Sequence, residues 1–286
     1  IILFSVIALS TTWGSRDYLD VHEDPNALRA TPEATVLLPT APLPVGPHII
    51  GPDLRLPRGC WVASWHPRSP ASRFQTPCDY DATINFNTAY LSITSGALMD
   101  LKEIAELTKD DEENQGYYFI AEALSVFTWQ VVTDLWGDMP YSEALKGDEG
   151  ILHPKANKSE DIYSDLLRRV DALLAMNLRG QSVDASYDFI YGGSLNRWKE
   201  FVYSLKLKLM IRQSETSGYS NANVLAFIED PNTEFIASSA KIAGSYWDDS
   251  MDGKRHPMRE FMTGGATYTS NDVIACKTFT LALIHI

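Results

Sequence analysis

The sequence predicts a mostly α-helical protein, and three observations carry this prediction. From residue 84 to residue 229, apolar side chains recur every three or four positions in successive segments, which is the period of an amphipathic helix. Glycine, proline, acidic and hydroxyl residues separate these segments, as expected at helix ends. The segment 39–77 instead carries a proline every few residues, so it is predicted to be irregular and rich in loops.

The first two predicted helices form a pair. One begins near Ile84, and the other follows the acidic run at 110–113, whose charge favours a helix N-terminus. Gly137 stands where the second helix ends, and Pro140 follows it, where it cannot continue a helix. The apolar stripes consist of Phe86, Tyr90, Ile93, Ala97, Leu101 and Ile104 in the first helix, and of Tyr117, Ala121, Leu124, Phe127, Val131 and Leu135 in the second.

Three more helices are predicted further along the chain. Ser159 is expected to be the N-cap of the third helix, which ends at Gly180, and Ser194 the N-cap of the fourth, which ends at Gly218. A short fifth helix covers 221–229. Their stripes include Ile162, Leu166, Val170, Leu173 and Leu174 in the third helix, and Leu195, Trp198, Val202, Leu205 and Leu209 in the fourth. Consecutive antiparallel helix pairs of this length fit helical-repeat packing, although no repeat consensus is visible.

The N-terminal part of the chain has a different character. The apolar run at 1–10 resembles the core of a signal peptide, so we interpret 1–16 as the remnant of one, with a short buried helix as the alternative. For the proline-rich segment at 39–80 two interpretations stay open. Part of it is read out of frame, or it is a genuine loop-rich insertion that carries Trp61 and Trp65.

Composition narrows the classes of function. The chain has 286 residues, and its net charge of −13 argues against nucleic-acid binding, which requires clustered lysine and arginine. The most basic stretch lies on the fourth helix, where a solvated helix face is expected. Its members are Arg197, Lys199, Lys206, Lys208 and Arg212. The three cysteines have no metal-binding spacing, and Cys60 and Cys78 can pair in an oxidising compartment.

Enzymatic chemistry has little support in the sequence. Residues 248–252 match a DDxxD pattern, which in some proteins holds Mg²⁺ against a diphosphate, but a polar loop is the preferred interpretation. Asp134, Asp138 and Glu143 flank the Gly137–Pro140 turn, where capping is expected rather than catalysis. The histidines show no HExxH spacing, and neither a nucleophile elbow nor a phosphate-binding loop is present. We therefore predict a protein that is not an enzyme and that needs no metal or cofactor.

Four segments together resemble a known family. Residues 133–145 (TDLWGDMPYSEAL) are similar to a "tDlfGdvPyseAl" signature, and 188–199 (DFIYGGSLNRWK) to "DliygGdl.kWk". Residues 154–163 and 201–208 are similar to two further motifs, "Pk.d...diY" and "FaNSLklR". This combination resembles the SusD/RagB-like proteins, the nutrient-binding outer-membrane lipoproteins of Bacteroidetes-type bacteria. In the resemblance, Asp134, Gly137, Asp138, Pro140, Tyr141 and Trp198 are structural motif residues.

The resemblance implies a fold and an organisation. The fold is a tetratricopeptide-like helical-repeat array with an irregular N-terminal segment. Residues 17–38 resemble the family's N-terminal arm, 81–263 form the helical domain, and 264–286 stay unassigned in what we expect to be a truncated chain. Family members carry a lipid on a cysteine just before the arm, where this chain has Gly14-Ser15-Arg16. A location at the cell surface, on the outer membrane, is therefore implied, and the mode of anchoring stays open.

The resemblance also implies a function. Family members capture an oligosaccharide or another nutrient and pass it to a TonB-dependent outer-membrane transporter. Sugars bind to flat aromatic rings, and four aromatic residues fall outside the helix stripes. We predict these as ligand-binding residues: Trp61, Trp65, Tyr80 and Trp247. Two alternatives remain, a periplasmic helical-repeat scaffold that binds protein, and, more remotely, an Mg²⁺-dependent prenyl-diphosphate enzyme that uses Asp248.

Overall fold

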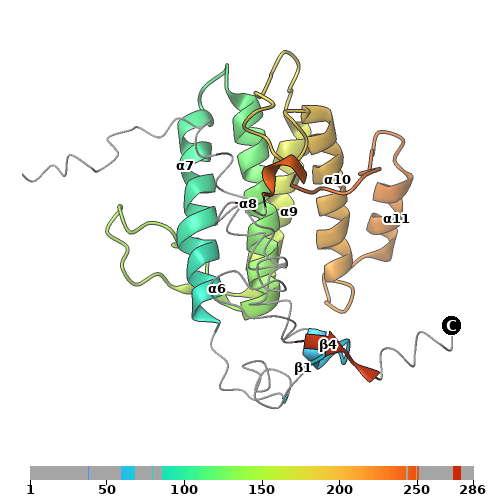
Figure 1. Ribbon diagram of the computed structural model, residues 1–286. Coiled ribbons are helices and arrows are strands. Elements are labelled where there is room, and N and C mark those ends of the chain that lie inside the picture. The colour runs from blue at the N-terminus through green and yellow to red at the C-terminus, as the bar shows by residue number, and fades with distance from the viewer. Residues whose placement is uncertain are drawn as a thin grey trace, which may run out of the picture. The chain divides into compact units, whose positions relative to one another are not determined.

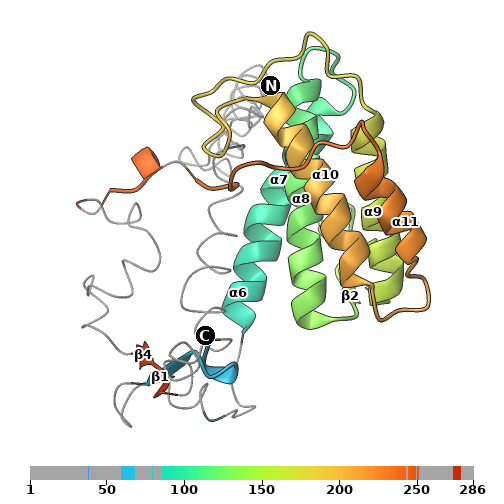
Figure 2. The same ribbon diagram turned by 90° about the vertical axis from the view of Figure 1, so that its right-hand side faces the viewer.

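A computed structural model describes residues 38, 59–67, 79, 86–242, 244–248, 250 and 273–277. Most of the described chain is an array of helices that pack side by side (Figures 1 and 2). The predictions for the signal remnant at 1–16 and for most of the arm at 17–38 lie outside the described residues. So do most of the proline-rich segment at 39–80 and of the tail at 264–286. The mostly α-helical prediction is confirmed.

The first predicted helix is present, but it is not regular. It consists of α6 (Asn87–Leu91), a π-helical segment η2 (Ser92–Leu98) and α7 (Met99–Thr108). Around the π-helical segment, the Thr94 and Ser95 hydroxyls donate hydrogen bonds to backbone carbonyls four residues earlier. Hydroxyls that reach back in this way compete with the helix ladder, and π-helical turns often mark such places. The predicted stripe is nevertheless buried from Ile93 to Ile104.

Helix α8 (Gln115–Trp136) lies at the centre of the array. It packs against η2, α7, α9 (Ser159–Ala175) and α10 (Leu195–Arg212), and more than half of its residues are buried. Because neighbours contact it from several sides, one narrow stripe does not describe its core face. The predicted stripe is correct at Tyr117, Ala121 and Leu124, and wrong at Leu135, whose side chain is 37% exposed.

The later helices follow their predicted stripes closely. Ile162, Leu166, Val170 and Leu173 of α9 are buried, as are Trp198, Val202, Leu205 and Leu209 of α10. Helix α11 (Asn221–Glu229) has its predicted bounds, and the Ser220 hydroxyl caps it by accepting a hydrogen bond from the Asn223 N–H group at 3.3 Å. One continuous buried core joins α6 to α10, and the buried Val224 of α11 lies outside it.

Several predicted helix ends are wrong. Helix α9 ends at Ala175 and α10 at Arg212, well before Gly180 and Gly218, because turns that sequence periodicity does not reveal follow each helix. Ser194 occupies the N-cap position of α10, but its hydroxyl makes no capping hydrogen bond. Ser159 is the first residue within α9 rather than its N-cap, which is Lys158.

Two short antiparallel strand pairs were not predicted. Strand β2 (Met139–Pro140) pairs with β3 (Ala156–Asn157), and β1 (Trp65–Pro67) pairs with β4 (Val273–Ala275). Strands of two or three residues carry too little alternation to be recognised in a sequence. Cys60, just before β1, is disulfide-bonded, whereas its predicted partner Cys78 lies outside the described residues.

The basic face of α10 makes more contacts than expected of a solvated surface. The Lys206 ammonium lies 2.7 Å from the Asp171 carboxylate of α9 and 4.7 Å from the ring centre of Phe227 in α11. The Arg197 guanidinium lies 4.6 Å from the ring centre of Tyr191. These cations therefore join α10 to its neighbours, which a periodicity analysis of one helix cannot show.

Candidate functional site

The segment with the strongest family signature forms a turn that joins α8 to α9. Gly137 ends α8 with a φ of 73°, a conformation that strongly favours glycine. Strand β2 follows at once and pairs with β3. The side-chain oxygen of Asn157 in β3 then accepts hydrogen bonds from the backbone N–H groups of Tyr141 and Ser142, at 3.2 and 3.0 Å. The turn is thus held against the start of α9.

Asp138 of the signature caps α9, as predicted, whereas Glu143 bonds the loop before β3 and caps no helix. The Asp138 carboxylate accepts hydrogen bonds from the backbone N–H group and the hydroxyl of Ser159, at 2.8 and 2.7 Å. A helix N-terminus leaves its first N–H groups without partners, and Asp138 satisfies one of them from a distant position. These bonds also lower the pKa of Asp138. The Glu143 carboxylate accepts a hydrogen bond from the Lys155 N–H group at 2.8 Å.

Asp134, the third acidic residue, links three helices. Its carboxylate accepts hydrogen bonds from Gln130 of α8 and from the hydroxyl of Tyr163 in α9, and it pairs with the Arg212 guanidinium of α10 at 3.0 Å. Burial raises the pKa of Tyr163 to about 12, and the neighbouring Asp134 carboxylate acts in the same direction. Asp134, Tyr163 and Arg212 border a hollow of about 790 Å³ between the start of α9 and the end of α10.

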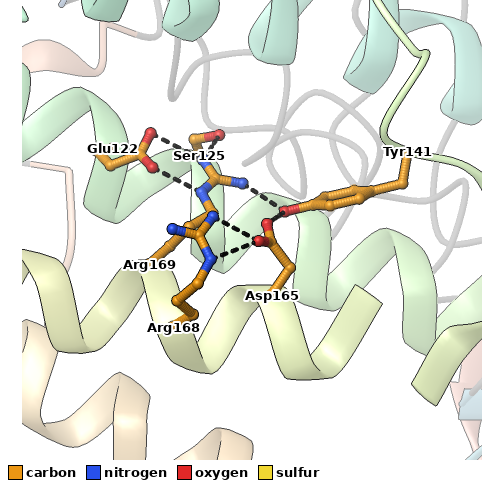
Figure 3. Close-up of polar contacts among 6 residues, drawn as sticks. All are labelled: Glu122, Ser125, Tyr141, Asp165, Arg168 and Arg169. Carbon is orange, nitrogen blue, oxygen red and sulfur yellow. Dashed lines mark hydrogen bonds and ion pairs between the residues drawn. The ribbon is translucent and has the colours of Figure 1, made fainter. Parts of the chain in front are cut away.

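A second polar network lies beside the turn and includes its tyrosine (Figure 3). The Arg169 guanidinium of α9 donates to both carboxylate oxygens of Glu122 in α8, at 2.6 and 2.8 Å. It also donates to the Ser125 hydroxyl at 2.8 Å and to the Tyr141 hydroxyl at 2.9 Å. The Tyr141 hydroxyl in turn donates to the Asp165 carboxylate at 2.6 Å. Together these bonds tie the turn to α8 and α9.

The charges in this network are balanced in pairs. Burial is the largest single effect on Arg169 and opposes its charged form, but the hydrogen bonds and charges of Glu122 and Tyr141 together outweigh it and hold the pKa of Arg169 above its ordinary value. Burial similarly opposes ionisation of Asp165, yet hydrogen bonds from Tyr141 and Arg168 lower its pKa. Burial raises the pKa of Tyr141 well above its ordinary range. The network is therefore built to hold fixed charges, not to exchange protons near neutral pH.

Asp188 organises the second family motif. It is buried, and its carboxylate accepts hydrogen bonds from the N–H groups of Ile190, Tyr191 and Gly193, at 3.0, 3.2 and 2.8 Å. The indole N–H of Trp198 donates to the same carboxylate at 2.7 Å. Four donors around one carboxylate compensate for its burial and fix the loop that leads into α10.

The predicted ligand-binding aromatics belong to different segments. Trp61 is 39% exposed and lies just before β1, and the backbone of Trp65 pairs with Ala275 of β4. Trp247 follows the short helical turn η3 (Gly244–Tyr246), and its ring stacks edge-to-face on Tyr246 at 5.2 Å. Tyr80 lies outside the described residues. The assignment of all four as ligand-binding residues stays a prediction.

The structure describes no metal centre. Within the described ranges, no group of three histidine, cysteine or acidic side chains is arranged to hold a metal ion. Of the DDxxD pattern, Asp248 accepts hydrogen bonds from the backbone N–H group and the hydroxyl of Ser250, at 2.8 and 2.6 Å. Asp249 and Asp252 of the same pattern lie outside the described residues.

The sequence analysis missed Arg169 and Glu122, and it underrated Asp188. Arg169 and Glu122 are 47 residues apart, so no local spacing relates them. The sequence around Asp188 did indicate its role. Asp188 stands shortly before two glycines and a tryptophan, and aspartates in glycine-containing turns often accept hydrogen bonds from backbone N–H groups. This indication was used only as part of the family motif.

Comparison with known proteins identifies the family of this chain. Residues 63–250 match the SusD-like family that is described as "Starch-binding associating with outer membrane". This match covers more than half of the chain, so the chain belongs to the SusD-like family. The identification made from the motifs is confirmed.

Solved structures share the fold. A SusD/RagB family protein from Bacteroides thetaiotaomicron has a TM-score of 0.72 at 18% identity, over 89% of this chain and 52% of the other. A SusD homologue from Bacteroides fragilis has a TM-score of 0.63 at 16% identity, over 88% and 50%. A chitin-binding SusD homologue from Flavobacterium johnsoniae has a TM-score of 0.57 at 18% identity, over 71% and 43%. The helical-repeat prediction is therefore confirmed.

Three further findings accompany the comparison. The chain spans about half the length of the solved structures it matches. Among curated proteins, none matches the chain. In the described part of the chain, no helix combines the length and apolar character that a crossing of the bilayer requires.

Proposed function

We propose that this protein binds an oligosaccharide or a similar nutrient at the surface of the outer membrane, for uptake by a TonB-dependent transporter. The match of residues 63–250 to a family described as starch-binding and outer-membrane-associated is the observation that carries the proposal. A solved structure with the same fold belongs to a chitin-binding homologue, which favours a glycan as the ligand. Capture and transfer require no bond to be made or broken.

The described side chains support a binding role over a catalytic one. Asp134, Asp138 and Glu143 all accept hydrogen bonds that join α8, α9 and the connection between them. A general acid or base must reach a substrate proton. Carboxylates that are occupied by structural donors are poorly placed for that task, so we propose that the chain is not an enzyme.

The ligand platform of the proposal consists of Trp61, Trp65, Tyr80 and Trp247. An aromatic ring covers the apolar face of a pyranose, and polar neighbours select its hydroxyl groups. The exposure of Trp61 fits this use, because a large aromatic side chain gains by being covered.

The proposal is tested by calorimetric titration of the purified protein with maltoheptaose and with chitohexaose. We expect saturable binding of at least one of them. Trp61→Ala and Trp247→Ala should each weaken that binding about ten-fold, which corresponds to about 1.4 kcal/mol. Tyr219→Ala is the matched control, since Tyr219 is an aromatic residue in a turn outside the predicted platform.

A helical protein that binds neither glycan, nor any member of a wider panel of neutral glycans, would overturn the proposal. The protein-binding scaffold would then be the better interpretation. Binding that both tryptophan variants retain in full would leave the glycan function standing but refute the predicted platform.

A further inference from the structure

A groove runs between α7, α8, α9 and the loop after the signature turn. It consists of two adjoining pockets of about 350 and 370 Å³, which share Lys109, Tyr118, Glu122 and Arg169 in their walls. Each pocket lies within the size range of small-molecule sites. The groove uses none of the four aromatic residues of the predicted ligand platform.

The groove differs in charge from the rest of the protein. Its acidic wall residues are paired, Glu122 with Arg169 at 2.6 Å and Asp165 with Arg168 at 2.5 Å. Lys102 lies 3.4 Å from Glu106. The chain as a whole has a net charge of −13, so a groove whose walls carry more basic than acidic side chains is unusual in this protein.

Two wall lysines remain without such a partner. Among the described residues, no carboxylate lies within ion-pair distance of the Lys109 or Lys146 ammonium, although Asp110 is next to Lys109 in the chain. Lys109 belongs to both pockets, and Lys146 to the one beside the turn. Two cations without an acidic partner therefore line the pocket beside the turn.

The loop that carries Lys146 is held in an unusual conformation. Leu145 has a φ of 59°, which non-glycine residues seldom adopt, while its side chain packs against the core. The Lys146 carbonyl accepts hydrogen bonds from the N–H groups of Glu149 and Ile151, at 3.2 and 3.0 Å. Strained conformations of this kind concentrate at functional sites, where the surrounding structure maintains them.

Aromatic rings form another part of the wall. Tyr141 and Trp129 pack edge-to-face with ring centres 4.9 Å apart, and Arg169 and Asp165 hold the Tyr141 hydroxyl in place (Figure 3). Tyr118 is half-buried, and its hydroxyl makes no hydrogen bond within the described chain. The groove thus offers a ring face and a free hydroxyl on α8, one cation at the end of α7 and another on the loop after the signature turn.

We propose that this groove binds a sugar residue that carries a carboxylate, such as a uronic acid. Lys109 and Lys146 contact the carboxylate, and the Tyr118 ring covers the apolar face of the pyranose. A sugar is favoured over an acidic peptide because the groove combines a ring face with cations, and because the proposed function is glycan capture, on which this inference rests. The site is additional to the predicted tryptophan platform.

The test is calorimetric titration of the full chain with trigalacturonic acid at low salt. The fully methyl-esterified trisaccharide, which has the same rings without the charge, and tetraglutamate are titrated in parallel. We expect saturable binding of the acid form alone, weakened at least ten-fold by 0.5 M NaCl. The double variant Lys109→Gln/Lys146→Gln should abolish it, and Tyr118→Leu should weaken it. Lys155→Gln, which changes an exposed lysine outside the groove, is the control.

Each outcome decides the inference. No binding of trigalacturonic acid, equal binding of the methyl ester, or unchanged binding by the double lysine variant would overturn it. Binding of tetraglutamate at the same lysines would also overturn it, in favour of a peptide site. Circular dichroism of each variant verifies that it folds. Titration of the same samples with maltoheptaose and chitohexaose tests the proposed function separately, so that the two can fail independently.

Discussion

Two buried polar centres in the described part of the chain, around Asp188 and around Arg169, are built in opposite ways. The Asp188 centre gathers its donors from one short stretch, residues 190–198. The Arg169 centre gathers its partners from α8, from the turn after it and from α9 (Figure 3). Asp188 fixes a loop conformation, whereas Arg169 fixes the packing of separate elements. A local centre leaves a readable motif in the sequence, and a dispersed centre leaves almost none.

The largest effect is expected at the dispersed centre. Arg169→Met removes the partner of Glu122, whose side chain is only 15% exposed, and leaves a carboxylate buried without a counter-charge. Loss of one partner from a buried ion pair costs about 3–5 kcal/mol. Urea denaturation monitored by circular dichroism measures this loss. Arg168→Met is the control, because the Arg168 side chain is 70% exposed, and its loss should cost less than about 1 kcal/mol.

A double variant separates the contribution of the ion pair from that of the other hydrogen bonds of Arg169. Arg169→Met/Glu122→Met replaces the ion pair by apolar side chains and should recover much of the lost stability, as such replacements often do. If the double variant were as unstable as Arg169→Met alone, the hydrogen bonds to Ser125 and Tyr141 would matter more than the ion pair.

A smaller loss is expected at the local centre. Asp188→Asn exchanges one accepting oxygen for an NH₂ group that faces N–H donors, and it removes the charge from the remaining bonds. We expect a loss of about 2–3 kcal/mol, again from urea denaturation. Asp184→Asn is the matched control, because the Asp184 carboxylate makes similar bonds to Ser186 at the surface. Equal effects of the two substitutions would show that the burial of Asp188 is unimportant.

Alanine variants of two adjacent glycines in the same loop distinguish the cost of backbone strain from the cost of a steric clash. Gly192 and Gly193 have φ values of 61° and 79°, so alanine is strained at both, at a cost of about 1–2 kcal/mol. Only at Gly193 would a Cβ atom also collide, 2.2 Å from the Val183 carbonyl oxygen. Gly193→Ala should therefore lower the melting temperature clearly more than Gly192→Ala. The same melting temperature for both would mean that the loop moves away from Val183 easily.

The smallest effect is an alkaline dependence of stability that involves Asp134. The pKa of Tyr163 is raised from 10.0 to about 12, so the folded state favours the protonated phenol. Its contribution to stability is complete below pH 10 and is lost as the pH rises from 10 to about 12. The loss of stability over this interval should be smaller in Tyr163→Phe than in the wild-type protein. Denaturation at pH 9 and pH 11 compares them, and identical losses would contradict the assignment.

Sequence patterns predicted the helices better than their ends. The stripes of α9 and α10 and the bounds of α11 were correct, because these helices bury one face, and apolar periodicity reports a single buried face directly. The stripe of α8 failed at Leu135 because neighbours surround that helix. The ends near Gly180 and Gly218 were wrong because turns intervene, and turn hydrogen bonds have no periodic signal.

The sequence by itself determined the helical class, the family and the capping role of Asp138, since each rests on local spacing or on a contiguous motif. Only the tertiary structure decided that Glu122, Tyr141 and Arg169 meet. It also decided that two lysines far apart in the chain face one groove. The physical reason is that helix formation and capping depend on neighbours in the chain. Charge pairing and groove walls depend instead on how the helices pack, and apolar side chains drive that packing without specifying polar partners.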